Sequence, residues 1–109
     1  MAIVYTPPPM STGADFAFAF VFPEGTDFSD LVVEYSLQTE TRTEIATLSS
    51  NGDDDRFVLD EDGGAVTVSF PAGTLPPGRY FHEARLRSIS TDETAILFDG
   101  RPYIYQGGF

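Results

Sequence analysis

The residues of this chain that could do chemistry are a single histidine, His82, and the carboxylates of two acidic stretches, 53–55 and 60–62. His82 alternates in phase with Tyr80 and Leu86, so we expect it on a core face as a hydrogen-bonded structural residue. The chain has no cysteine and no G-x-S-x-G motif, so nucleophilic catalysis has no candidate group of residues. We therefore expect a protein that is not an enzyme and that needs no cofactor.

The first acidic stretch has a spacing that could ligate calcium. Asn51, Asp53 and Asp55 alternate along the chain, as oxygen ligands do at the start of a calcium loop. The full D-x-[DN]-x-[DN]-G-x₅-E spacing is not met. Two interpretations stay open at this point, a weak calcium site and a solvated turn.

The charge of the chain limits its partners. Seventeen acidic residues against six arginines give a net charge of −11, and there is no lysine. Such a surface repels nucleic-acid phosphates and anionic membranes, so we expect neither as a partner. The start of the chain lacks a basic region and a long apolar run, so we also expect no signal peptide and no membrane span.

The elements that must position these groups are strands. Apolar residues recur with period two, and no segment has the i, i+3, i+4, i+7 spacing of a helix. Seven or eight short strands spaced about ten residues apart predict an all-β, immunoglobulin-like, two-sheet antiparallel sandwich. We expect these strands at 15–22, 31–38, 43–50, 56–59, 65–70, 79–88, 95–98 and 101–106.

The stretch ADFAFAFVF, 14–22, places one phenylalanine at every second position. We expect the four rings to line the interior of the sandwich. The opposite face would then carry only Ala17, Ala19 and Val21, whereas a strand face in water usually carries polar residues. One interpretation is that the protein tolerates these small apolar residues on a face exposed to solvent. The other is that the protein's own arm or another subunit covers the face. Ala17 and Ala19 are therefore candidate partner-binding residues.

Three further motifs carry a family resemblance. Asp30-Leu31 opens the second long strand, an L-x-x-G-x-Y corner runs over 75–80, and an L-x-x-G step runs over 97–100. In this order the chain resembles, over about 14–106, the small immunoglobulin-like N-terminal domain of siphophage baseplate upper proteins and related tailed-phage structural proteins. The resemblance implies a virion protein, made in the host cytoplasm, whose partners are other virion structural proteins or copies of itself.

The domain organisation follows from these observations. We expect an extended N-terminal arm over 1–13, the sandwich over 14–106 and a C-terminal tail over 107–109. Polyproline-type geometry at 6–9 suits an arm that docks with little loss of entropy. The candidate partner-binding residues at the two ends are Tyr5, Pro7, Pro8, Pro9 and Phe109.

Two functions fit this organisation. The first is a non-enzymatic structural or accessory protein that binds capsid, neck or tail subunits through sheet edges and terminal arms. The second is a carbohydrate- or host-surface-binding module that uses the loops at 23–27, 51–55 and 89–93, with Tyr103 and Tyr105 as stacking residues.

Overall fold

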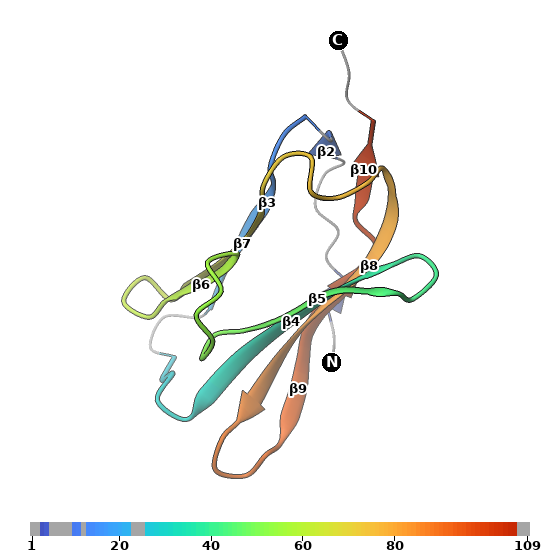
Figure 1. Cartoon of the computed structure of the whole chain (residues 1–109). Helices are drawn as coiled ribbons and strands as arrows, with labels where there is room; N and C mark the ends of the chain where they lie inside the picture. The colour runs from blue at the N-terminus through green and yellow to red at the C-terminus, as the bar shows by residue number, and fades with distance from the viewer. Residues whose placement is uncertain (1–2, 5–9, 12, 23–25, 107–109) are drawn as a thin grey trace.

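The protein is an all-β sandwich, seen in a computed structural model that describes residues 3–4, 10–11, 13–22 and 26–106 (Figure 1). In this described part of the chain, no helix is long and apolar enough to cross a membrane. Eight strands have three or more residues, close to the ranges predicted from period two, and two have only two residues. The strands are β1 (Ile3–Val4), β2 (Met10–Ser11), β3 (Phe16–Val21), β4 (Leu31–Thr39), β5 (Glu44–Ser49), β6 (Phe57–Asp60), β7 (Ala65–Phe70), β8 (Gly78–Ser88), β9 (Thr94–Gly100) and β10 (Tyr103–Tyr105).

The strands form two facing layers (Figure 1). The smaller sheet has the order β3-β7-β6 and is antiparallel throughout. In the larger sheet, β8 pairs with β4 on one side and with β9 and β10 on the other, and β5 pairs with β4. This arrangement confirms the predicted immunoglobulin-like sandwich, because β3, β7 and β6 match strands B, E and D, and β5, β4, β8 and β9 match C′, C, F and G.

The two-residue strands depart from a purely antiparallel design. Both β1 and β2 lie in the predicted arm; β1 pairs in parallel with β9, and β2 pairs in parallel with β10. In immunoglobulin constant domains, strand A lies beside strand B in the first sheet. Here the described parts of the N-terminal segment pair with the larger sheet instead.

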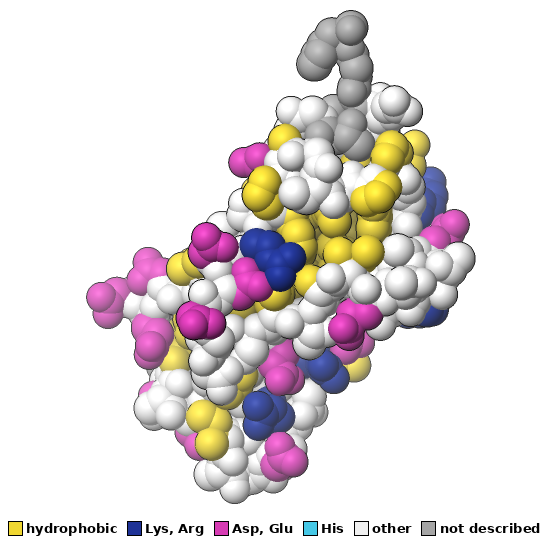
Figure 2. Space-filling model, in the orientation of Figure 1, with side chains coloured by type: hydrophobic (Ala, Val, Ile, Leu, Met, Phe, Trp, Pro, Cys, Tyr) yellow, Lys and Arg dark blue, Asp and Glu magenta, His cyan; other side chains and the backbone are white. Residues whose placement is uncertain are grey.

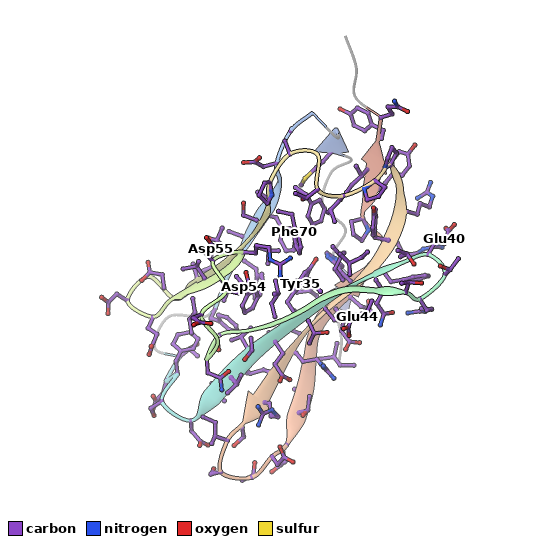
Figure 3. The ribbon with its side chains drawn as sticks, in the orientation of Figure 1. Tyr35, Glu40, Glu44, Asp54, Asp55 and Phe70 are labelled. Atoms are coloured by element: carbon purple, nitrogen blue, oxygen red, sulfur yellow. The ribbon has the colours of Figure 1, made fainter. Side chains whose placement is uncertain are left out.

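The predicted phenylalanine ladder faces the core. Phe16 and Phe22 are buried, and Phe18 and Phe20 are half-buried against the same cluster. Consecutive rings of the ladder lie 5.8 to 6.5 Å apart between centroids, within the range of favourable aromatic pairs. Tyr35, on β4, is the largest of the fully buried side chains in the described chain. Figure 3 shows it pointing between the layers.

His82 is the buried polar residue at the centre of this core. Its Nδ1 lies 2.9 Å from the hydroxyl of Tyr35, and its ring lies 5.5 Å from Phe18 and 5.3 Å from Phe98. The side chain is 3 % exposed, so the prediction of a hydrogen-bonded structural histidine is confirmed. The hydrogen bond matters because a buried polar group without a partner costs about 1–3 kcal/mol.

The L-x-x-G-x-Y motif forms the corner at which the chain enters β8. The hydroxyl of Tyr80 donates a hydrogen bond to the backbone carbonyl of Pro76, 2.5 Å away, and Leu75 is buried in the core cluster. A tyrosine at this place that bonds backwards to the main chain is the tyrosine corner of immunoglobulin-like sandwiches. Gly78 has a φ of 146°, a conformation that suits glycine.

We predict that Tyr35→Phe destabilises the fold by about 1–3 kcal/mol at neutral pH, because it removes the hydrogen-bond partner of His82 Nδ1 in the core. Burial raises the pKa of Tyr35 well above its ordinary 10.0. The stabilisation linked to this shift is complete below pH 10 and is lost as the pH rises toward the folded-state pKa. The variant should therefore lose less of its stability between pH 9 and pH 11 than the wild type does.

Urea unfolding at a series of pH values measures both effects. Burial also raises the pKa of Tyr80, so the variant should keep part of the alkaline decline. Tyr103→Phe removes the hydroxyl of an exposed tyrosine and serves as the matched control. An alkaline decline equally steep in Tyr35→Phe and in the wild type would contradict the prediction.

Candidate functional site

Strand β3 has an open backbone edge. Among the residues that the structure describes, β3 pairs only with β7. Phe22 donates its N–H to the carbonyl of Gly64, whereas Ser69 of β7 donates away from β3, to the carbonyl of Arg56. Because hydrogen-bonding direction alternates along an antiparallel strand, the N–H and C=O groups of Ala17, Ala19 and Val21 point to the open edge.

The usual protections of a sheet edge are missing along β3. Natural proteins place charges, proline or bulges on edge strands to prevent pairing with other chains. The six residues Phe16–Val21 carry no charge and no proline, and their register with β7 is continuous. Ala17 and Ala19 are exposed, as predicted, and Val21 is 74 % exposed.

Next to β3 the outer face of the β3-β7-β6 sheet is also uncharged, and the outermost strand, β6, carries Asp60 opposite Ala65. Thr67 lies opposite Ala19, and Ala65 lies opposite Val21. Val58 of β6 lies opposite Thr67 and is 51 % exposed. Side chains this small let another backbone approach closely. Several acidic side chains gather at the end of the molecule where β6 and its flanking loops lie, and others are spread over the rest of the visible face (Figure 2).

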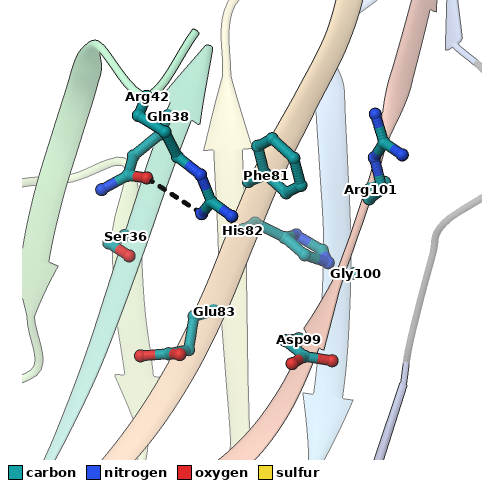
Figure 4. A pocket seen from close by; sticks show the side chains of 9 residues that line it. All are labelled: Ser36, Gln38, Arg42, Phe81, His82, Glu83, Asp99, Gly100 and Arg101. Carbon is teal, nitrogen blue, oxygen red and sulfur yellow. Dashed lines mark hydrogen bonds between the residues drawn. The ribbon is translucent and has the colours of Figure 1, made fainter. Parts of the chain in front are cut away.

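A groove of about 640 Å³ lies on the other sheet, beside the β4–β5 hairpin (Figure 4). The hairpin loop forms one wall, and the β9–β10 turn forms the other. Outward side chains of β4, β8 and β9 form the floor. Its lining residues are Ser36, Gln38, Arg42, Phe81, His82, Glu83, Asp99, Gly100 and Arg101.

Two guanidinium groups hold the ring of Phe81 at the top of the groove. The Cζ atom of Arg42 lies 3.8 Å from the ring centroid and that of Arg101 lies 4.8 Å from it. Figure 4 shows the ring between the two arginines. Arg101 also forms an ion pair with Glu40, at 2.9 Å, which ties the hairpin tip to the β9–β10 turn. The groove is thus built by residues far apart in the sequence.

The backbone of Arg42 is in a left-handed conformation. Its φ is 70°, at the position of a short hairpin loop where glycine is usual. A non-glycine residue there costs roughly 1 kcal/mol, and such strain occurs most often at functional sites. In this conformation the side chain crosses Phe81, and the Gln38 amide oxygen lies 3.5 Å from Arg42 Nη1.

The floor of the groove carries two neighbouring carboxylates. Glu83 and Asp99 lie directly opposite each other on β8 and β9, an arrangement of like charges that destabilises a sheet. Arg85 Nε lies 3.5 Å from Glu83. The next arginine along β8, Arg87, pairs with Glu34 and Asp92. Within the described chain, the carboxylate of Asp99 forms no hydrogen bond or ion pair.

The two acidic stretches lie in mostly exposed turns of the described part of the chain. No group of three or more histidine or acidic side chains there is arranged to hold a metal ion. Asn51 accepts a hydrogen bond from the hydroxyl of Ser49, and Asp54 forms a bidentate pair with Arg56. Asp53 and Asp55, the other two calcium candidates, are exposed in the same loop. Figure 3 shows Asp55 beside Asp54.

The structure brings some of the predicted binding residues together and separates others. The side chain of Asp30 accepts hydrogen bonds from Ser88 and Ser90, so the β3–β4 and β8–β9 loops meet at one end. Tyr103 pairs with Arg79 at the opposite end of β8, so the two tyrosines of β10 cannot share a site with those loops. The arm and tail candidates Tyr5, Pro7, Pro8, Pro9 and Phe109 lie outside the described residues.

The groove itself was missed by sequence reasoning. The alternation of Phe81, Glu83, Arg85 and Arg87 places these side chains on the outward face of one strand. The sequence did not reveal that the β4–β5 hairpin loop brings Arg42 to the ring of Phe81, or that the turn between β9 and β10 brings Arg101 to the same ring. No protein-family model matches this chain, and the search of curated proteins returned no similar sequence.

We predict that the carboxyl group of Asp54 titrates at about pH 2, because hydrogen bonds from Arg56 lower its pKa from the ordinary 3.8. Since the folded-state pKa is depressed, the stabilisation linked to this pair is present above about pH 4 and is lost as the pH falls toward 2. In Arg56→Gln the pKa should return toward 3.8. NMR titration of the side-chain carboxyl carbons measures it, and an unchanged midpoint in Arg56→Gln would contradict the assignment.

Proposed function

We propose that this chain is a non-enzymatic structural or accessory protein of a tailed-phage virion and that it binds neighbouring subunits through an open sheet edge. The observation that carries the proposal is the unprotected edge of β3, with three backbone N–H and C=O pairs directed outward. A strand edge of this kind is a template for pairing with another chain.

A second copy of this chain is the occupant that the edge fits best. With a net charge of −11, two copies repel each other over most of their surfaces, and β3 is a strand without any charge. Antiparallel pairing centred on Ala19 places Ala17 opposite Val21 of the second copy. A two-fold axis perpendicular to the sheet keeps every phenylalanine on the inner face, so the two three-stranded sheets join into one of six strands.

The virion setting is supported by the sequence resemblance and by the shape of the protein. The L-x-x-G-x-Y motif that contributes to the resemblance is the corner made by Tyr80. The described residues form an aromatic core with an open edge at β3, which suits a building block. Binding of neighbours is the activity that such surfaces support.

Recognition of a carbohydrate or host surface is the second candidate function. The observation that favours it is the contact between the β3–β4 and β8–β9 loops through Asp30. A glycan array probed with the monomeric protein tests this candidate, and clean binding would favour it over assembly.

We predict that Ala19→Arg abolishes self-association, because pairing centred on Ala19 would place two arginines opposite each other. Thr67→Arg is the matched control, since it adds the same charge to the same face one strand further from the edge. Light scattering across a range of protein concentrations should show dimers in the wild type and in Thr67→Arg but monomers in Ala19→Arg.

Ala19→Pro provides an independent check, because it removes an outward N–H without disturbing the hydrogen bonds to β7. Circular dichroism confirms that each variant is folded. A wild type that stays monomeric at all concentrations, or an Ala19→Arg variant that associates normally, would disprove pairing through β3. Cryo-electron microscopy of purified phage particles tests the virion assignment separately, and absence of this protein from the particles would overturn it.

A further inference from the structure

We infer that the groove beside the β4–β5 hairpin binds an arginine or lysine side chain of a partner protein. This inference concerns the larger sheet and does not depend on the open edge of β3. It starts from charges in the groove that the chain leaves unmatched.

One of the two floor carboxylates has no cation beside it. Asp99 is half-buried, lies opposite Glu83 and has no hydrogen-bond or ion-pair partner in the described chain. Glu83 forms an ion pair with Arg85, at 3.5 Å. A cationic group placed between the two carboxylates would relieve their repulsion, and Ser36, opposite Glu83 on β4, adds a hydroxyl to the same row.

The arginines of this chain do not fill that place. Arg42 and Arg101 are held at Phe81, and Glu40 binds Arg101. Further along β8, Arg87 is engaged by Glu34 and Asp92. Arg85 is paired with Glu83, so a cation beside Asp99 would come from another molecule, and the net charge of −11 attracts a basic one.

The position of Arg42 indicates what else the ligand carries. Within the described residues, its guanidinium contacts the face of Phe81 and an amide oxygen but no carboxylate. Phe81 and Glu83 are two residues apart on β8, so the two ends of the groove are separated by about 6.6 Å of strand. An extended arginine or lysine side chain spans a similar length, so its main-chain carbonyl or terminal carboxylate would reach Arg42.

The test uses Nα-acetyl-L-arginine as the probe, followed by two-dimensional NMR of the full chain. We expect saturable shifts at the groove residues. Nα-acetyl-L-citrulline has the same shape without the positive charge and should not bind. Nα-acetyl-L-arginine amide lacks the carboxylate and should bind more weakly than the acid.

Two matched variants assign the contacts. Asp99→Asn should weaken binding at least about tenfold, because it removes a charge-assisted hydrogen bond. Glu61→Gln makes the same change of charge in an exposed turn and should leave binding unchanged. Arg42→Gly suits the left-handed backbone and should remove the preference for the acid over the amide.

Three results would overturn the inference: no binding of the arginine probe, equal binding of the citrulline probe, or equal affinity of Asp99→Asn and the wild type. Binding that persists in Ala19→Arg would separate this site from the assembly edge, because that substitution lies on the opposite sheet.

Discussion

The hydrogen bond between Tyr35 and His82 is the interaction on which the rest of the structure depends. In an immunoglobulin domain, a disulfide between strands B and F and a tryptophan on strand C hold the sheets together. This chain has neither residue type. His82 lies two residues after the corner tyrosine, where the second cysteine of the disulfide would stand, and Phe18 of β3 packs against it. Tyr35 on β4 completes the link, so edge-to-face and tilted ring contacts and one buried hydrogen bond connect the two sheets in place of the disulfide.

Because this link lies between the sheets, the outer faces of both sheets can carry binding surfaces. His82 points inward from β8, and its neighbours Phe81 and Glu83 point outward into the groove. The same strand therefore anchors the core and carries the floor of the groove. A rigid strand of this kind holds the floor carboxylates in place while the hairpin loop supplies Arg42 from one side.

The recurrence of apolar residues at every second position made most of the fold predictable. It located the strands, the inward phenylalanines and the buried His82, because side chains on a strand must alternate between faces. It could not locate the groove, because Arg42 and Arg101 reach Phe81 through a left-handed loop residue and a break between strands. The open edge of β3 was also hidden, since it depends on β1 and β2 joining the larger sheet, and two-residue pairings leave no periodic signal.

The two proposed contacts differ in symmetry, and this difference bears on assembly. Pairing through β3 joins identical surfaces about a two-fold axis, so it closes after two copies. In the inferred contact the groove would accept a cation, so it joins two different surfaces, and the net charge of −11 favours a basic partner over a second acidic copy. It therefore suits a different, basic protein rather than another copy. Since the groove and the β3 edge lie on separate sheets, a dimer joined through β3 would present two such grooves at once.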